Sequence, residues 1–108
     1  MARKAQPLFT LQTVGEVLKE YILNRGEVTQ EALADALGVS RLTVNQLVND
    51  KRSVTAEMAL RLAQVLGTSP EFWLDLQRDL DLAKARAELG ERLPDLPVLR
   101  RQSVRKTG

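Results

Sequence analysis

The side chains best suited to chemistry in this sequence are amides, hydroxyls and basic groups gathered between residues 30 and 52. Asparagine and glutamine form paired hydrogen bonds with adenine, and arginine does so with guanine, at the base edges in the major groove of DNA. Lysine and arginine also neutralise phosphates. We expect four of these residues to contact bases: Arg41, Thr43, Asn45 and Gln46. We expect five others to contact DNA phosphates: Gln30, Ser40, Asn49, Lys51 and Arg52.

Two short predicted helices position these side chains. Thr29 and Ser40 are residue types that begin helices and Gly38 is a type that ends one, so we expect helices over 30–37 and 41–49. Apolar residues recur where two crossing helices need them: Leu33, Ala34, Leu37, Val39, Val44 and Leu47. The polar residues of the second helix must then face outward. The pattern predicts a helix-turn-helix, although a glycine turn between any two short helices produces part of it.

Three further helices are predicted around this pair. Thr13 with Glu16 is the signature of a capping box, and apolar spacing continues the helix to residues 25–26. Thr55 begins a helix that ends at Gly67, and Ser69 begins the longest helix, which ends near Gly90. The sequence therefore predicts an all-α fold of five helices. Two prolines break any helix after it, and residues 98–104 permit a short strand.

The longest predicted helix carries an apolar stripe that one small domain cannot cover. We expect a homodimer whose interface contains Trp73, Leu76, Leu80 and Ala83. The aromatic residues of this helix are at core spacing, so we assign them to packing rather than to base stacking. A two-fold dimer would place two reading helices about 34 Å apart on one face of DNA.

Composition limits the remaining possibilities. The 108 residues contain no cysteine or histidine, which removes thiol nucleophiles, imidazole bases and most zinc ligands, so we expect no enzyme, metal or cofactor. No apolar run approaches the ~20 residues of a membrane span and no secretory signal is evident, which favours a cytoplasmic protein. We divide the chain into an N-terminal arm (1–12), a DNA-binding and dimerisation domain (13–90) and a basic C-terminal tail (91–108).

Several stretches resemble a known family. The segments 13–18, 30–55 and 59–62 resemble the XRE and lambda-repressor-like helix-turn-helix proteins, and the block 66–77 followed by Asp81 and Leu82 resembles the HigA-type, or VapI-like, antitoxins. The similarity spans residues 14–87. It implies a dimer that binds double-stranded operator DNA, represses its own operon and neutralises a toxin similar to the HigB and RelE messenger-RNA endonucleases. Val14 stands where the family often has proline, and the basic tail matches no family pattern.

Two alternatives remain open. The chain could be a free-standing repressor of the XRE type without a toxin, which a neighbouring gene for a small basic protein would distinguish. It could instead be a protein-interaction module that no longer binds DNA, but the retained donors on the second short helix argue against that. Lys51 and Arg52 also fit a solvated loop, although their position beside a reading helix favours phosphate contacts.

Overall fold

The structure, a computed structural model, describes residues 12–23, 26 and 28–100. Its elements in chain order are α1 (Val14–Leu18), the π-helix η2 (Lys19–Leu23), α2 (Gln30–Leu37), α3 (Arg41–Val48), α4 (Ala56–Leu66), α5 (Pro70–Leu89) and the 3-10 turn η3 (Leu93–Asp95). The five α-helices confirm the predicted fold class. No helix in the described part is long and apolar enough to cross a membrane.

The five α-helices begin at the hydroxyl residues that the sequence indicates. In each case the side-chain oxygen accepts a hydrogen bond from a backbone N–H three residues later: Thr13, Thr29, Ser40, Thr55 and Ser69. Glu16 completes the capping box at Thr13, because its carboxylate accepts the Thr13 N–H at 3.0 Å. Gly38 and Gly67 end α2 and α4 in the left-handed conformation, with φ of 75° and 73°.

Two details of the predicted elements need correction. The first helix is α-helical only to Leu18 and then continues as a π-helix, because apolar spacing over so few residues does not separate the two hydrogen-bonding patterns. The expected strand over 98–104 is absent from its described part, residues 98–100, which have no neighbouring strand to pair with. The rest of that segment and residues 1–11 of the expected arm lie outside the described residues.

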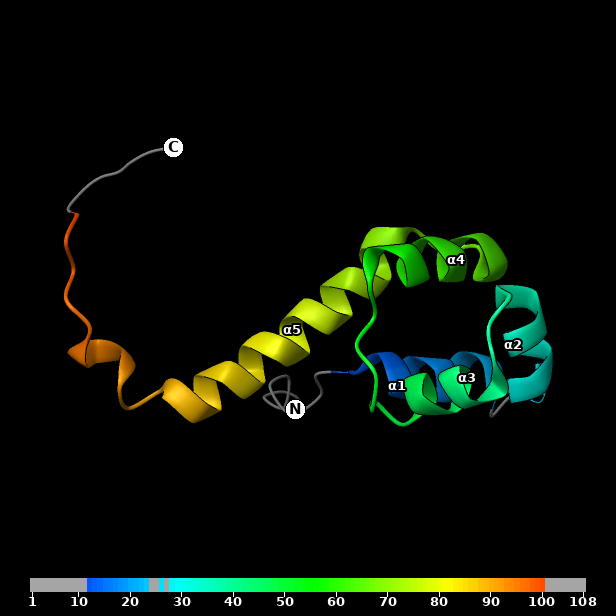
Figure 1. Ribbon diagram of the computed structural model, residues 1–108, viewed down its shortest axis with the longest axis horizontal. Helices are drawn as coiled ribbons and strands as arrows, with labels where there is room; N and C mark the ends of the chain where they lie inside the picture. The colour runs from blue at the N-terminus through cyan, green and yellow to red at the C-terminus, as the bar shows by residue number, and fades with distance from the viewer. Residues whose placement is uncertain (1–11, 24–25, 27, 101–108) are drawn as a thin grey trace, which may run out of the picture.

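One core holds the helices together. Its buried members come from α1 to α4, from the α3–α4 loop and from the first turn of α5: Val14, Val17, Leu18, Leu33, Ala34, Leu37, Val44, Leu47, Val48, Val54, Ala59, Leu62 and Trp73. The apolar residues of the predicted helix-turn-helix are all here, except Val39, which is partly buried against the core. Figure 1 shows α5 leaving this bundle and projecting away from it. Every residue from 81 to 100 is exposed.

Gly15 lets α1 approach the end of α3 closely. A Cβ at this position would overlap the backbone carbonyl oxygen of Val48 and lie 2.7 Å from the Asp50 carboxylate. A backbone atom cannot rotate away as a side chain can. The close packing of α1 on α3 therefore requires glycine at this position.

We expect Gly15→Ala to lower the free energy of unfolding by roughly 1 to 3 kcal/mol, as overpacking in a core does. Thermal and urea unfolding followed by circular dichroism measure this loss. Gln64→Ala, at an exposed position of α4, is the control and should unfold like the parent protein. An unchanged midpoint for Gly15→Ala would contradict the close approach.

Candidate nucleic-acid interface

The outer face of α3 carries the residues predicted to read bases. Val44 and Leu47 on its inner face are completely buried, which fixes the rotation of the helix. Arg41 and Asn45 are exposed as a result, whereas Thr43 and Gln46 are partly buried. The structure thus brings the four predicted residues together on one short helix. The two exposed ones are the most accessible to a ligand.

Gln30 lies beside this surface. It is the first residue of α2, and its Oε1 accepts a hydrogen bond of 3.3 Å from Asn45 Nδ2. The contact joins a residue predicted to bind phosphate to one predicted to read bases. Gln30 therefore connects α2 to the outer face of α3 through the Asn45 amide.

Gln46 has a similar partner in the loop after α3. Arg52 Nε donates a hydrogen bond of 3.0 Å to Gln46 Oε1, so the arginine folds back toward α3. The predicted base-reading and phosphate-binding residues are consequently linked at two points. A substitution of Lys51 would leave the Arg52–Gln46 hydrogen bond intact, whereas a substitution of Arg52 would remove it.

Ser40, Thr43 and Asn49 stabilise the ends of α3. Ser40 Oγ accepts the Thr43 N–H and lies 3.0 Å from Thr43 Oγ1, which accounts for much of the hydrogen bonding of both hydroxyls. Asn49 Nδ2 donates to the backbone carbonyl of Asn45 at 2.9 Å. Ser40 and Asn49 remain exposed, so both can still face a phosphate.

The loop after α3 is anchored at both ends. Asp50 adopts a left-handed conformation with φ of 55°, and its carboxylate accepts hydrogen bonds from the Gly15 N–H at 2.9 Å and from Thr13 Oγ1 at 2.6 Å. At the other end, the Val54 N–H donates to Gln77 Oε1 at 2.9 Å. Asp50 is not among the site residues predicted from the sequence. Its residue type, which tolerates positive φ and caps helices, was the available signal.

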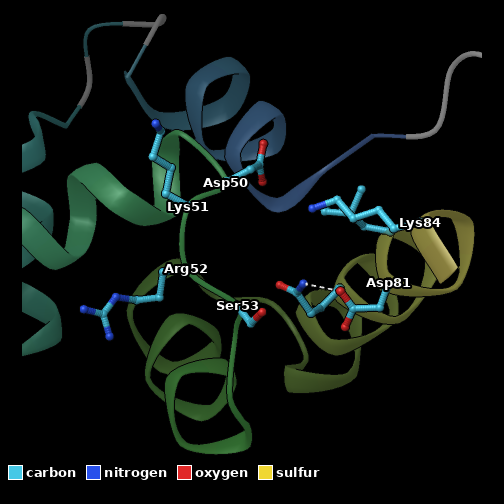
Figure 2. A pocket seen from close by; sticks show the side chains of 8 residues that line it. Asp50, Lys51, Arg52, Ser53, Asp81 and Lys84 are labelled. Carbon is cyan, nitrogen blue, oxygen red and sulfur yellow. Dashed lines mark hydrogen bonds between the residues drawn. The ribbon is translucent and has the colours of Figure 1, made fainter. Parts of the chain in front are cut away.

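A cleft lies between this loop and α5 (Figure 2). Lys84 reaches from α5 toward the loop that carries Lys51, and Asp81 is held by a 3.0 Å hydrogen bond from Gln77 Nε2. The cleft is therefore lined by Lys84 from α5 and by Lys51 and Arg52 from the loop, together with the carboxylates of Asp50 and Asp81. Lys84 was not predicted from the sequence, because only the packing of α5 on the bundle brings it to a loop more than 30 residues earlier in the chain.

Comparisons with known proteins agree with this geometry. The helix-turn-helix family model matches residues 18–73, slightly more than half of the chain. The antitoxin HigA-1 of Vibrio cholerae is 46% identical over 74 residues, which make up 68% of this chain and 70% of that protein. The chain belongs to the HigA-type helix-turn-helix family. Virulence-associated protein I of Dichelobacter nodosus is also similar, at 38% identity over 74 residues, 68% of each chain.

Solved structures of the antitoxins HigA and GraA share the fold of this chain. The Pseudomonas aeruginosa antitoxin HigA with the higBA promoter matches with a TM-score of 0.75 and 37% identity, over 82% of this chain and 97% of that one. The antitoxin GraA in complex with its operator matches with a TM-score of 0.75 and 39% identity, over 85% of this chain and 92% of that one. Both of those antitoxins were solved with DNA.

In this HigA-type chain, α5 does not offer the whole predicted stripe to a partner. Trp73 is only 2% exposed, its Nε1 donates to Thr68 Oγ1 at 2.6 Å, and its ring packs edge-on against Phe72. Its expected place in a dimer interface is therefore corrected: the first turn of α5 lies on the bundle, so Trp73 belongs to the core. Leu76 is partly buried against the same core. Leu80 is partly buried and Ala83 is exposed, which leaves the later part of the stripe accessible.

Proposed function

We propose that this protein is a sequence-specific DNA-binding antitoxin that represses its own operon. The observation that carries the proposal is the α3 surface, where Arg41 and Asn45 are exposed while the opposite face is locked into the core. These side chains suit guanine and adenine edges. Two solved relatives contain promoter or operator DNA, which supports the proposed DNA-binding role. We propose that the protein acts in the bacterial cytoplasm.

Two residues, Leu42 and Lys84, extend the proposed DNA contacts beyond those predicted from sequence, and a third, Asp50, supports them. Leu42 is 64% exposed on the same face of α3, where its methyl groups suit the methyl group of thymine. Lys84 joins Lys51 at the cleft as a phosphate contact. Asp50 positions the loop through α1 and does not touch DNA itself.

The toxin partner rests on kinship with the HigA antitoxins. We propose that it is a HigB- or RelE-like messenger-RNA endonuclease and that it binds away from α3. Co-expression with the adjacent open reading frame, followed by pull-down and a gel-shift assay on the shared promoter, tests both functions. A promoter that is not shifted would overturn the DNA-binding role. A neighbouring product that is neither toxic nor captured would leave a free-standing repressor.

A double substitution separates the two proposed surfaces. Asn45→Ala with Gln46→Ala should release repression of the promoter while the protein still protects cells from the toxin, because only α3 is changed. A promoter reporter and a growth assay measure the two effects. Loss of protection by a folded and abundant variant would show that toxin and operator share this surface.

The cations after α3 should contribute without reading sequence. Lys51→Ala should weaken binding to operator and random DNA equally and reduce the salt dependence of binding by about one unit, because one phosphate contact is lost. Arg52→Ala should additionally weaken operator specificity, because Gln46 loses its 3.0 Å partner. Binding curves at several salt concentrations measure both. Equal effects of the two substitutions on specificity would contradict the role of Arg52.

A homodimer is the assembly that we propose for operator binding, with the exposed later half of α5 at its interface. Ala83→Glu should raise the dimer dissociation constant at least tenfold, because a charge enters an apolar contact while the fold of the protomer is untouched. Leu80→Asp is the companion variant. Sedimentation equilibrium measures the constant, and a parent protein that is monomeric at tens of micromolar would remove the α5 dimer.

A further inference from the structure

Apolar side chains near the start of the basic C-terminal tail are exposed in a single protomer. In the described part, up to residue 100, Leu93, Leu96, Val98 and Leu99 are exposed, and the exposed fraction rises from 43% at Leu93 to 93% at Leu99. On α5 just before the tail, Leu82 and Leu89 are exposed as well. Figure 1 shows this segment held away from the bundle at the far end of α5. So many exposed leucines in sequence are typical of a surface that another protein covers.

The charges of the chain indicate which protein surface covers these apolar side chains. The basic tail, residues 91–108, contains five basic side chains and two acidic ones. The first part of α5, residues 70–82, contains four acidic side chains and one basic one: Glu71, Asp75, Asp79, Asp81 and Arg78. The tail and the beginning of α5 therefore have opposite net charges. In one protomer they lie at opposite ends of a 20-residue helix.

A second copy of the chain brings the two regions together. If two α5 helices pair antiparallel with their centre between Leu80 and Ala83, residue 89 of one helix is level with a residue between 71 and 77 of the other. The tail of each protomer then begins beside the acidic part of the other α5. A parallel pair would instead place two basic tails side by side, which is unfavourable.

We propose that residues 92–100 of each protomer, the described start of the tail, pack on the first part of the partner's α5 as an exchanged arm. The leucines of the tail cover apolar surface that includes Phe72, which is 39% exposed, and Arg92 and Arg100 lie near Glu71 and Asp75. This inference rests on the proposed α5 dimer and adds a second, separate part to its interface. A DNA backbone offers no apolar surface for the leucines, and a basic toxin would repel the arginines.

Removing the apolar side chains of the tail tests the arm in the full-length chain. Leu96→Ser, Val98→Ser and Leu99→Ser together should raise the dimer dissociation constant about tenfold or more in sedimentation equilibrium. All three residues are exposed, so the fold should be unaffected. Leu60→Ser is the control, since Leu60 is nearly as exposed as Leu96, at 60% and 63%, but lies on α4. An unchanged constant in the triple variant would overturn the arm while leaving the α5 dimer intact.

A charge exchange tests the partner surface. Arg92→Glu with Arg100→Glu should weaken the dimer, and adding Glu71→Lys with Asp75→Lys should restore it, because the opposite charges meet again across the interface. At high salt, both pairs of substitutions should change the dimer dissociation constant much less, because salt screens the charges. Failure of the second pair to restore dimerisation would contradict the proposed contact.

Cross-linking locates the arm directly. The sequence contains no cysteine, so Leu96→Cys can carry a single photoreactive maleimide. In a mixture of labelled chains and isotopically heavy unlabelled chains, the expected product joins residue 96 to a peptide from residues 70–82 of the other chain. Products within one chain, or products that form only with operator DNA or with a co-expressed toxin, would overturn the proposal. If the parent protein forms no dimer, both the α5 dimer and the exchanged arm are overturned.

Discussion

Replacing Arg41 and Asn45 together with alanine should weaken operator binding by roughly 2 to 6 kcal/mol, since a matched base contact contributes about 1 to 3 kcal/mol. Both side chains are exposed on α3 and neither supports the core. Binding to random DNA should fall much less, mainly through the lost charge of Arg41. The ratio of the two affinities, measured by fluorescence anisotropy on operator and scrambled duplexes, isolates the specific part.

Single substitutions show how the reading surface is organised. Asn45→Ala also removes the hydrogen bond to Gln30. Gln30→Ala alone should therefore reduce operator specificity less than Asn45→Ala does. The double variant should lose less specificity than the sum of the two single losses. Gln64→Ala on α4 is the control for a polar side chain outside the interface. If Arg41→Ala and Asn45→Ala weaken operator and scrambled DNA equally, α3 is not the reading helix.

Replacing Val44 with aspartate should destabilise the protein by more than about 4 kcal/mol, because a carboxylate would enter a fully buried position. Val44 is 0% exposed and packs where α3 meets the rest of the core. A loss of this size is comparable to the whole stability of many small domains. We expect largely unfolded protein at 37 °C, together with loss of both operator binding and toxin protection.

Leu42→Asp is the matched control for Val44→Asp. It introduces the same charge two residues earlier on the same helix, where the side chain is 64% exposed, so the melting temperature should stay within a few degrees of the parent value. Its operator binding should still fall, since a carboxylate would replace the apolar side chain proposed to face thymine and would be repelled by the negative charge of DNA. Circular dichroism melting of both variants measures the difference. A folded Val44→Asp protein would contradict the rotation of α3 described above.

Local sequence determined most of the helices. Each α-helix begins at a serine or threonine because a side-chain oxygen satisfies a free N–H of the first turn, and that chemistry involves residues only three apart. Gly38 and Gly67 end helices because they adopt positive φ without strain. The outward face of α3 also followed from sequence, since the burial of Val44 and Leu47 leaves only one side of a short helix exposed.

Only the tertiary structure decided how that face is supported and what α5 leaves exposed. The Gln30–Asn45, Arg52–Gln46 and Asp50–Gly15 hydrogen bonds join residues whose proximity depends on helix crossings and on a loop conformation. The position of Trp73 in the core depends on how far α5 lies on the bundle before it projects away. Helical spacing gives the direction of an apolar stripe, but not which part of it the same protomer covers. That division follows from packing between elements distant in sequence, which local patterns do not contain.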